Sequence, residues 1–270
     1  KEISTSRQDL QQLFPDTLVP QGVQIPNQIS LQGSFKGDMQ ELHAKTKLQT
    51  SLGMIVSDIR MQDMAGERPG YRGSIESDTL QMGIFMKDTA MFGPLKIEAE
   101  LRGSGFKPAE MNARANLKIP FAELNDYLYH NMDFEAAVSL NKYTVRGSIN
   151  DEYVEFSLDG EYIADSLRPE IDLILNLKAA NLQELNLAEE DIRVRGKLTA
   201  DLEGKNMDDI NGELRTKNVL IIKNGQPIPV DSLVFVALNE SSGTSLEIES
   251  SILDARFKGN LKISELAKSI

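Results

Sequence analysis

The chain has 270 residues, a formal net charge of −12 and no cysteine, so disulfides, thiolate metal sites and thiol catalysis are excluded. Nucleic-acid binding draws its affinity from clustered Lys and Arg. The acidic balance therefore argues against a nucleic-acid partner and against attraction to an anionic membrane surface. No run of about eighteen apolar residues occurs, so the sequence predicts no membrane-spanning helix. Because the chain begins at Lys1 without Met, we expect a processed or excised piece that has lost a signal or anchor.

The first third of the chain predicts one short helix and then paired strands. Residues 6–14 place apolar side chains close to helical spacing, and Pro15 stops the helix. Apolar and polar residues then alternate over residues 29–35 and 42–48, which predicts two strands joined by a hairpin turn. Residues 71–86 predict a further pair of strands, after a loop with Pro-Gly turn chemistry.

The middle of the chain repeats this alternation and interrupts it once. In residues 95–103 every second residue is charged and the others are apolar or Gly, and residues 112–119 predict the returning strand. Residues 120–129, PFAELNDYLY, place apolar residues at three- and four-residue spacing after a proline suited to a first helical turn, which predicts a helix. Strands resume over residues 134–140 and 143–149.

The clearest strand of the sequence is residues 192–204, IRVRGKLTADLEG. One side of it is apolar or glycine and the other side is charged or polar. Buried parallel strands read as continuous apolar runs, so this alternation indicates an antiparallel sheet that is covered on one face only. At about 3.3 Å per residue the strand spans roughly 40 Å, and it must belong to a wide sheet whose apolar face needs a cover.

The last third continues as strands. Residues 212–222 predict the strand that returns beside residues 192–204, and apolar runs follow over residues 230–238 and 246–263. Short helical turns are expected over residues 182–187 and 264–270. The sequence thus predicts a mainly β protein, with half or more of its residues in strands and a few short helices.

Two internal similarities recur along the chain. One is Leu-x-Gly, a polar turn and an apolar-x-x-Ala/Gly return, and it begins at Leu31, Leu101 and Leu202. The other is a basic residue before Gly. Its copies are Arg72-Gly73, Arg146-Gly147, Arg195-Gly196 and Lys258-Gly259. Their spacing is irregular, unlike that of a solenoid, so they indicate a hairpin unit reused along a sheet. The alternative, that β-rich sequences place Gly in similar contexts by chance, stays open.

The sequence contains no recognisable catalytic or cofactor-binding motif. It has no Gly-rich phosphate loop, nucleophile elbow or zinc-binding pair, and the acidic groups at residues 189–191 and 208–209 lack calcium-loop spacing. His43 is expected to be an exposed histidine on a charged face, and His130 to lie at the C-terminal end of the helix predicted over residues 120–129. The sequence therefore predicts a protein that is not an enzyme and carries no cofactor or metal.

Four stretches carry a resemblance to a known family. They are PQGVQIPNQISLQGSFKGDMQELHAKTKLQTSLG, LRGSGFKPAEMNARANLKI, LILNLKAANLQELNL and LTADLEGKNMDDINGELRTKNVLI. The chain resembles the AsmA-like superfamily, and within it the TamB-type (translocation and assembly module) proteins of Bacteroidetes-like bacteria. The likeness extends over most of the chain, and it is carried by hairpin patterns instead of a catalytic signature.

The resemblance implies an architecture and a location. It implies a long, twisted antiparallel sheet curled into a groove, taco-like or as an open barrel, apolar inside and charged outside. Residues 1–270 would then be a single elongated segment of repeated hairpins. It also implies an internal piece of a periplasmic protein that is anchored in the inner membrane through a segment outside this chain. A partnership with an outer-membrane β-barrel assembly protein would also use regions outside it.

The function expected from this resemblance is envelope biogenesis without catalysis. The module would form part of a bridge between the inner and outer membranes, and its groove would carry phospholipid or assist outer-membrane protein assembly. Lipid acyl chains are the expected partners. The candidate groove-lining residues are Leu101, Leu173, Leu175, Ile192, Val194, Leu198, Leu202, Phe257 and Leu261.

Two other classes remain open at this point. In a structural or adhesive β-sandwich the same residues would pack on one another, and no lipid would enter. A glycan-binding β domain is disfavoured because Trp is absent and aromatic residues make up 6% of the chain, which leaves few stacking platforms.

Overall fold

The structure of the protein is a computed structural model. It describes residues 2–6, 24, 26–107, 109–164, 167–230, 232–240, 243–250 and 254–259. Strands dominate, and within these ranges the helices are limited to α2 (Met82–Met86) and the 3-10 turn η2 (Met207–Asp209). The prediction of a mainly β, antiparallel protein is therefore confirmed. The helices expected over residues 6–14 and 264–270 lie outside the described residues.

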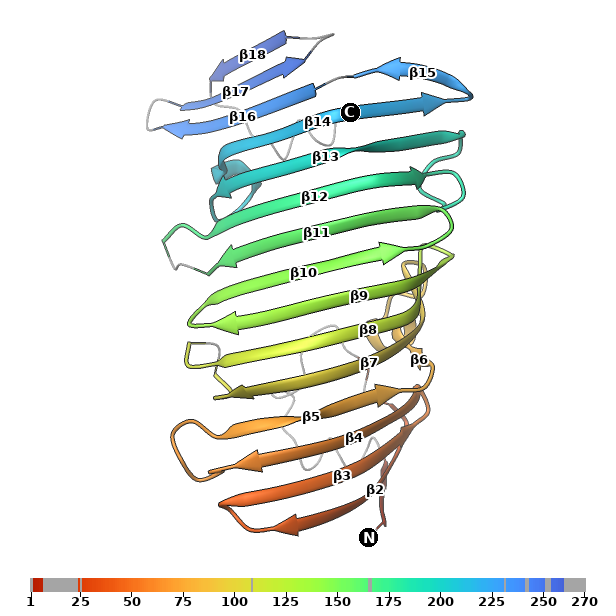
Figure 1. Cartoon of the computed structure of the whole chain (residues 1–270), viewed down its shortest axis with the longest axis vertical. Helices are drawn as coiled ribbons and strands as arrows, with labels where there is room; N and C mark the ends of the chain where they lie inside the picture. Colours follow the sequence, from red (N-terminus) through yellow and green to blue (C-terminus); the bar gives the residue numbers. More distant parts are fainter. Residues whose placement is uncertain are drawn as a thin grey trace. The chain divides into compact units, whose positions relative to one another are not determined.

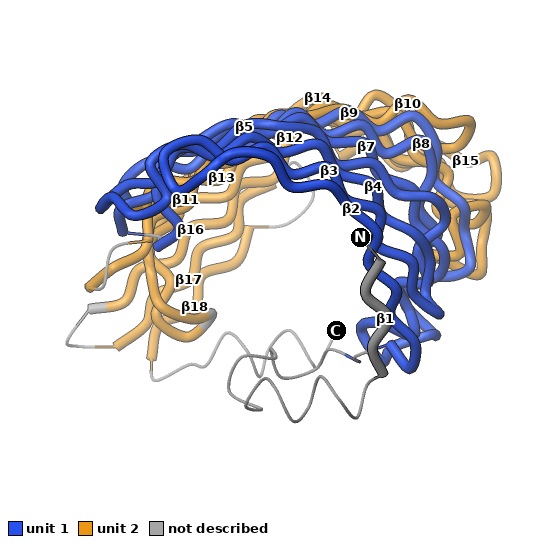
Figure 2. Tube along the Cα trace, turned by 90° about the horizontal axis from the view of Figure 1, so that it is seen from below, with its two compact units in different colours: residues 1–140 blue, residues 141–270 orange. Residues whose placement is uncertain are grey.

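The chain divides into two compact units, residues 1–140 and residues 141–270, which are coloured separately in Figure 2. Unit 1 is an antiparallel meander in which each strand pairs with the next (Figure 1). Its main strands are β2 (Gln28–Gly37), β3 (Glu41–Thr50), β4 (Gly53–Gln62), β5 (Gly70–Ser77), β7 (Phe92–Ser104), β8 (Asn112–Leu124) and β9 (Tyr127–Ser139). Two short strands complete it: β1 (Glu2–Ser6) pairs with β2, and β6 (Leu80–Gln81) pairs with β7.

Unit 2 follows the same plan. Its strands are β10 (Lys142–Asn150), β11 (Val154–Ile163), β12 (Glu170–Asn181), β13 (Ile192–Glu203), β14 (Asn211–Lys223), β15 (Gln226–Pro229), β16 (Ser232–Glu240), β17 (Gly243–Ser250) and β18 (Asp254–Gly259). Each pairs antiparallel with its neighbour, and β15 and β16 share β14, pairing with its last and first residues respectively. Strand β13 is the long alternating strand that the sequence predicts over residues 192–204.

The pairing register keeps one face of each sheet apolar. In unit 2, Leu158 lies opposite Leu175, and Leu175 lies opposite Leu198. The residues beside them in sequence point to the other face, where Asn176 lies opposite Lys197. A slip by one residue would exchange the faces, so the alternation itself selects this register.

Each unit is a curved single sheet. Figure 2 shows the strands of both units bending along their length, which gives each sheet a concave and a convex face. Charged positions of the strands are mostly exposed, whereas apolar positions are mostly half-buried. On the concave face of a curved sheet the side chains converge and bury one another more than side chains on the convex face do. The lower exposure of the apolar positions therefore assigns the apolar face to the concave side. The expected curl into a groove is seen within each unit.

Few apolar side chains are fully buried. Those among the described residues are Leu52, Met132, Ile149, Val154, Ala180, Leu185, Ala200, Ala237 and Leu246. The pairings of the described strands in each unit build one sheet, and no second sheet of the same unit packs on its apolar face. The apolar face of each sheet is therefore incompletely shielded by the described part of its own unit.

The helix expected over residues 120–129 is wrong. This segment forms the end of β8 and the start of β9, with a two-residue turn in which Asn125 and Asp126 both adopt positive φ, 53° and 60°. A register shift near Pro120 breaks the alternation of β8, because proline lacks the N–H that a regular ladder needs. The apolar residues of this segment have helical spacing because they belong to two different strands, the end of β8 after its register shift and the start of β9.

Two other expectations change in detail. Residues 71–86, expected as two strands, form β5, the two-residue β6 and the short helix α2. Residues 182–187 form hydrogen-bonded turns, in which Leu185 N–H donates to the carbonyl of Asn181 at 3.1 Å. Leu185 is fully buried there and anchors the connection between β12 and β13.

Candidate functional site: the apolar sheet faces

The described candidate lining residues of unit 2 lie on one face of its sheet, most of them on the adjacent strands β12 and β13 and one on the more distant β18. Leu175 and Leu198 lie directly opposite each other on β12 and β13. In the same pair of strands Leu173 lies opposite Ala200, Ile171 opposite Leu202, and Ala180 opposite Val194. Ile192 continues the face at the start of β13, and Phe257 on β18 lies opposite Leu246 on β17. Leu261 lies outside the described residues.

An exposed apolar row crosses this face near one end of the strands. Tyr143, Tyr162 and Ile171 lie side by side on β10, β11 and β12, with exposed fractions of 36%, 39% and 44%. The two tyrosine rings are 6.0 Å apart. Phe257, which is 45% exposed, belongs to the same face on β18. Sequence reasoning missed the two tyrosines and Ile171, although the alternation of their strands already placed them on the apolar side.

In unit 1 the face is lined by a mixture of small and large residues. Leu101 on β7 lies between Gly73 on β5 and Ala115 on β8. Towards the strand ends, the ring of Tyr71 stacks on Phe106 at 5.3 Å. Small residues beside large ones leave an uneven apolar surface, and nothing in the arrangement is specific for one position of a ligand.

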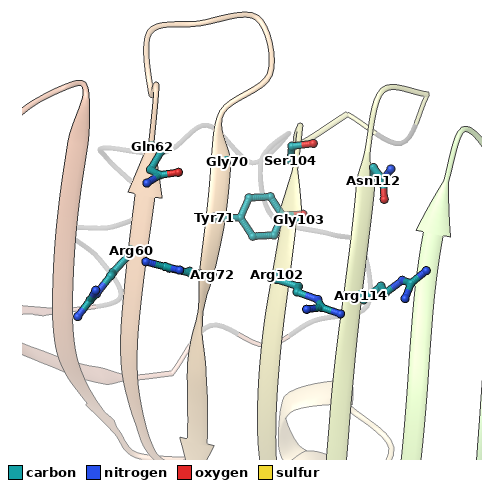
Figure 3. Close-up of a pocket in the computed structure, with 10 residues that line it drawn as sticks. All are labelled: Arg60, Gln62, Gly70, Tyr71, Arg72, Arg102, Gly103, Ser104, Asn112 and Arg114. Carbon is teal, nitrogen blue, oxygen red and sulfur yellow. The ribbon is translucent and has the colours of Figure 1, made fainter.

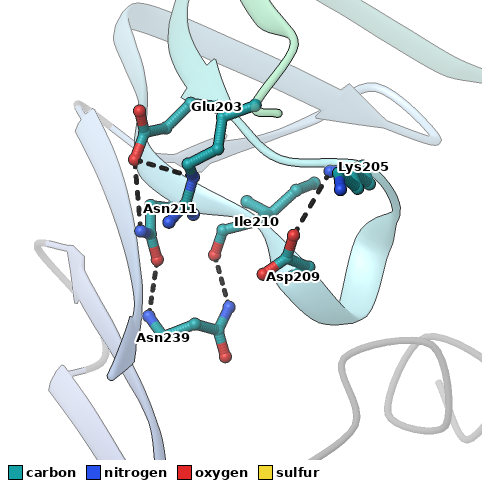
Figure 4. Close-up of polar contacts among 7 residues, drawn as sticks. Glu203, Lys205, Asp209, Ile210, Asn211 and Asn239 are labelled. Atoms are coloured by element: carbon teal, nitrogen blue, oxygen red, sulfur yellow. Dashed lines mark hydrogen bonds and ion pairs between the residues drawn. The ribbon is translucent and has the colours of Figure 1, made fainter. Parts of the chain in front are cut away.

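A polar network ties β13, β14 and β16 together at one end of unit 2 (Figure 4). Asn239 N–H donates to Asn211 Oδ1 at 2.6 Å, and Asn239 Nδ2 donates to the Ile210 carbonyl at 2.7 Å. Asn211 Nδ2 in turn donates to Glu203 Oε1 at 3.2 Å, and Arg168 Nε lies 3.3 Å from the same oxygen. This end of the three strands is therefore held together by polar contacts, whereas Leu175 and Leu198 lie nearer the centre of the sheet.

The two histidines lie on different strands, His43 on β3 and His130 on β9. His43 Nε2 lies 2.5 Å from Asp58 Oδ1, and its side chain is 27% exposed, so the expectation of an exposed histidine is wrong. Hydrogen bonds from Lys45 and then from His43 lower the pKa of Asp58. His130 lies on β9 opposite Phe121 instead of at a helix end.

The acidic groups pair with nearby basic residues. Asp191 accepts hydrogen bonds from Arg193, and Glu190 Oε2 lies 2.7 Å from Lys223 Nζ. Within the described ranges, no three His, Asp or Glu side chains gather as metal ligands would. In that same part of the chain, no helix has the length and apolarity needed to cross a bilayer.

Comparison with known proteins adds no assignment: no family model matches the chain, and neither a curated protein nor a solved structure does.

Proposed function

We propose that the apolar face of these curved sheets binds lipid acyl chains, and that the protein is a non-enzymatic module of the bacterial cell envelope. One observation carries the proposal: along each unit most apolar side chains stay half-exposed, and the described strands of that unit form no second sheet that covers them. In the setting of the AsmA-like, TamB-type resemblance, the module is periplasmic and belongs to a bridge between the two membranes. It carries phospholipid along that bridge or assists outer-membrane protein assembly.

The exposed apolar area favours binding of an apolar ligand. Burial of apolar surface is worth roughly 25 cal/mol per Å², so a continuous apolar face is costly to leave in water. An acyl chain offers apolar surface without hydrogen-bonding groups and can lie along a curved face of any length. The polar side chains near the centre of the face are hydrogen-bonded within the sheet, as Thr46 Oγ1 is to Ser57 Oγ at 2.6 Å. They therefore do not fix a bound chain at one position, and the chain can slide along the face.

The alternative is a structural or adhesive β-sandwich. It requires a second layer that packs on the apolar face and buries residues such as Leu175, Leu198 and Tyr162. In the described structure Tyr162 is 39% exposed and the two leucines are half-buried. This exposure favours a face that receives a ligand.

The test is direct. The full chain is expressed in bacteria and purified without detergent. Its bound lipids are extracted and identified by mass spectrometry. Binding of a fluorescent fatty acid to the purified protein is then titrated. We expect co-purified phospholipid and saturable binding of the probe. A protein that contains no lipid and does not bind the probe would contradict the proposal and favour the sandwich.

A further inference from the structure

The opposite face of unit 1 carries an arginine row that the proposed lipid binding does not use. Arg60 on β4 lies directly opposite Arg72 on β5, Arg72 lies opposite Arg102 on β7, and Arg102 lies opposite Arg114 on β8. Figure 3 shows the four side chains at one level across the four strands. Residues 71 and 103 alternate with them and belong to the apolar face, so the row lies on the charged face.

This arrangement is electrostatically unfavourable without a counterion. Directly opposite residues on antiparallel strands have Cβ atoms about 5 Å apart, and like charges at that distance repel. None of the four arginines forms an ion pair with a carboxylate of the described residues. Acidic positions on this face lie one step along the strands. They are Asp58, which is bound to His43 and Lys45, Glu100, Glu41 on β3 and Glu135 on β9.

The row lies in a pocket that is suited to an anion. The pocket has a volume of about 540 Å³ and is lined by the four arginines and by polar residues that include Gln62, Ser104 and Asn112. No carboxylate lines it. Gly70 contributes no side chain, which keeps the space between β4 and β7 open. Four guanidinium groups and several neutral donors thus surround one volume, in a chain whose net charge is −12.

The geometry favours phosphate groups as the ligand. Guanidinium forks donate paired hydrogen bonds to phosphate oxygens, and a phosphate monoester carries between one and two negative charges at neutral pH. Strands are about 4.8 Å apart, so the row of four spans roughly 14 Å, more than a single phosphate can bridge. We propose that the arginine row binds a ligand that carries two or more phosphate groups, either a soluble polyphosphate or the headgroup of a lipid.

The experiment compares charge-matched variants of the full chain. Tripolyphosphate is titrated calorimetrically into the wild type, into Arg72→Gln/Arg102→Gln and into Lys47→Gln/Lys118→Gln, whose exposed lysines lie on the same face outside the row. We expect the arginine variant to bind about a hundredfold more weakly, since each charge-assisted contact is worth about tenfold, and the lysine variant to bind as the wild type does. Circular dichroism verifies that each variant is folded.

Two further measurements identify the ligand source and confirm the site. Vesicles of phosphatidylcholine with cardiolipin, whose headgroup carries two phosphates, bind if the source is lipid, and tripolyphosphate then displaces the protein. A soluble ligand gives tripolyphosphate binding without vesicle binding. Tripolyphosphate should also raise the melting temperature of the wild type but not that of the arginine variant. The inference is overturned if neither probe binds, or if both double variants weaken binding equally. Acyl-chain binding to the other face is unaffected by either result.

Discussion

Gly73 on β5 approaches the backbone of Asp58 on β4 so closely that a Cβ atom on Gly73 would lie 2.1 Å from the Asp58 carbonyl oxygen. The obstacle is backbone, which cannot rotate away as a long side chain can. The glycine of this basic residue-Gly motif is therefore required by the close approach of two strands on the apolar face of unit 1.

Gly73→Ala is expected to destabilise the protein by about 1–3 kcal/mol, because the strands must separate to admit the methyl group. The matched control is Gly70→Ala on the same strand, where a Cβ would meet its nearest neighbour at 3.9 Å. That variant should leave the free energy of unfolding within about 0.5 kcal/mol of the wild type. Urea unfolding followed by circular dichroism measures both. Equal stabilities of the two variants would show that β4 and β5 do not approach as described.

A charge on the apolar face should separate ligand binding from folding. Leu175→Glu places a carboxylate on the face opposite Leu198, and Asn176→Glu places the same group on the charged face opposite Lys197. Because the apolar face is half-exposed, the new charge at residue 175 stays hydrated and the protein remains folded. Binding of a fluorescent fatty acid should fall at least about tenfold for Leu175→Glu.

Asn176→Glu should bind the probe as the wild type does. Circular dichroism and thermal melting are recorded for both variants. If Leu175→Glu unfolds the protein while Asn176→Glu does not, residue 175 is an ordinary core residue and the lipid-binding proposal loses its basis.

The alternating strands could be predicted from the sequence because each one carries its own face pattern. Residues 192–204 show this most clearly: their apolar side chains form one face of β13, as expected. The helix expected over residues 120–129 failed because the pattern crosses a turn. Phe121 and Leu128 belong to different strands, and Phe121 lies opposite His130 across the hairpin. The apolar spacing over ten residues is the same for such a hairpin as for a short continuous helix, so it cannot distinguish the two.

The arginine row could not be predicted from the sequence, for a different reason. Arg60, Arg72, Arg102 and Arg114 are separated by unequal numbers of residues, and each alone is typical of a solvated strand face. Only the register of three successive strand pairs brings them to one level. Loop lengths and bulges set that register, and the sequence pattern of a single strand contains neither.

The hairpin turn between β8 and β9 gives a prediction whose sign distinguishes the two interpretations of residues 120–129. Asp126 has a φ of 60°, a conformation that glycine adopts without steric cost. Asp126→Gly should therefore stabilise the protein by up to about 1 kcal/mol, and Asp126→Val should destabilise it by about 1–2 kcal/mol. If residue 126 lay inside a helix, Asp126→Gly would instead lower the free energy of unfolding by about 1 kcal/mol. Urea unfolding of the two variants decides between hairpin and helix, and a loss of stability in Asp126→Gly would contradict the hairpin.

Asp58 should make the stability of the protein depend on pH in the acid range. Hydrogen bonds from Lys45 and His43 lower the pKa of the Asp58 carboxyl below its ordinary value of 3.8. A lowered pKa in the folded state means that the unfolded chain takes up the proton first as the pH falls. The stabilisation by Asp58 is therefore complete above about pH 4 and is lost as the pH falls through the folded-state value.

Asp58→Asn should be less stable than the wild type at neutral pH, and the difference should shrink below about pH 4. Urea midpoints measured at a series of pH values test this. Lys45→Met removes the larger of the two causes, because Lys45 Nζ lies 2.9 Å from Asp58 Oδ2. In that background Asp58→Asn should show a weaker pH dependence, as expected for two residues that are coupled. A pH-independent difference between wild type and Asp58→Asn would mean that Asp58 stabilises the sheet through packing and not through its charge.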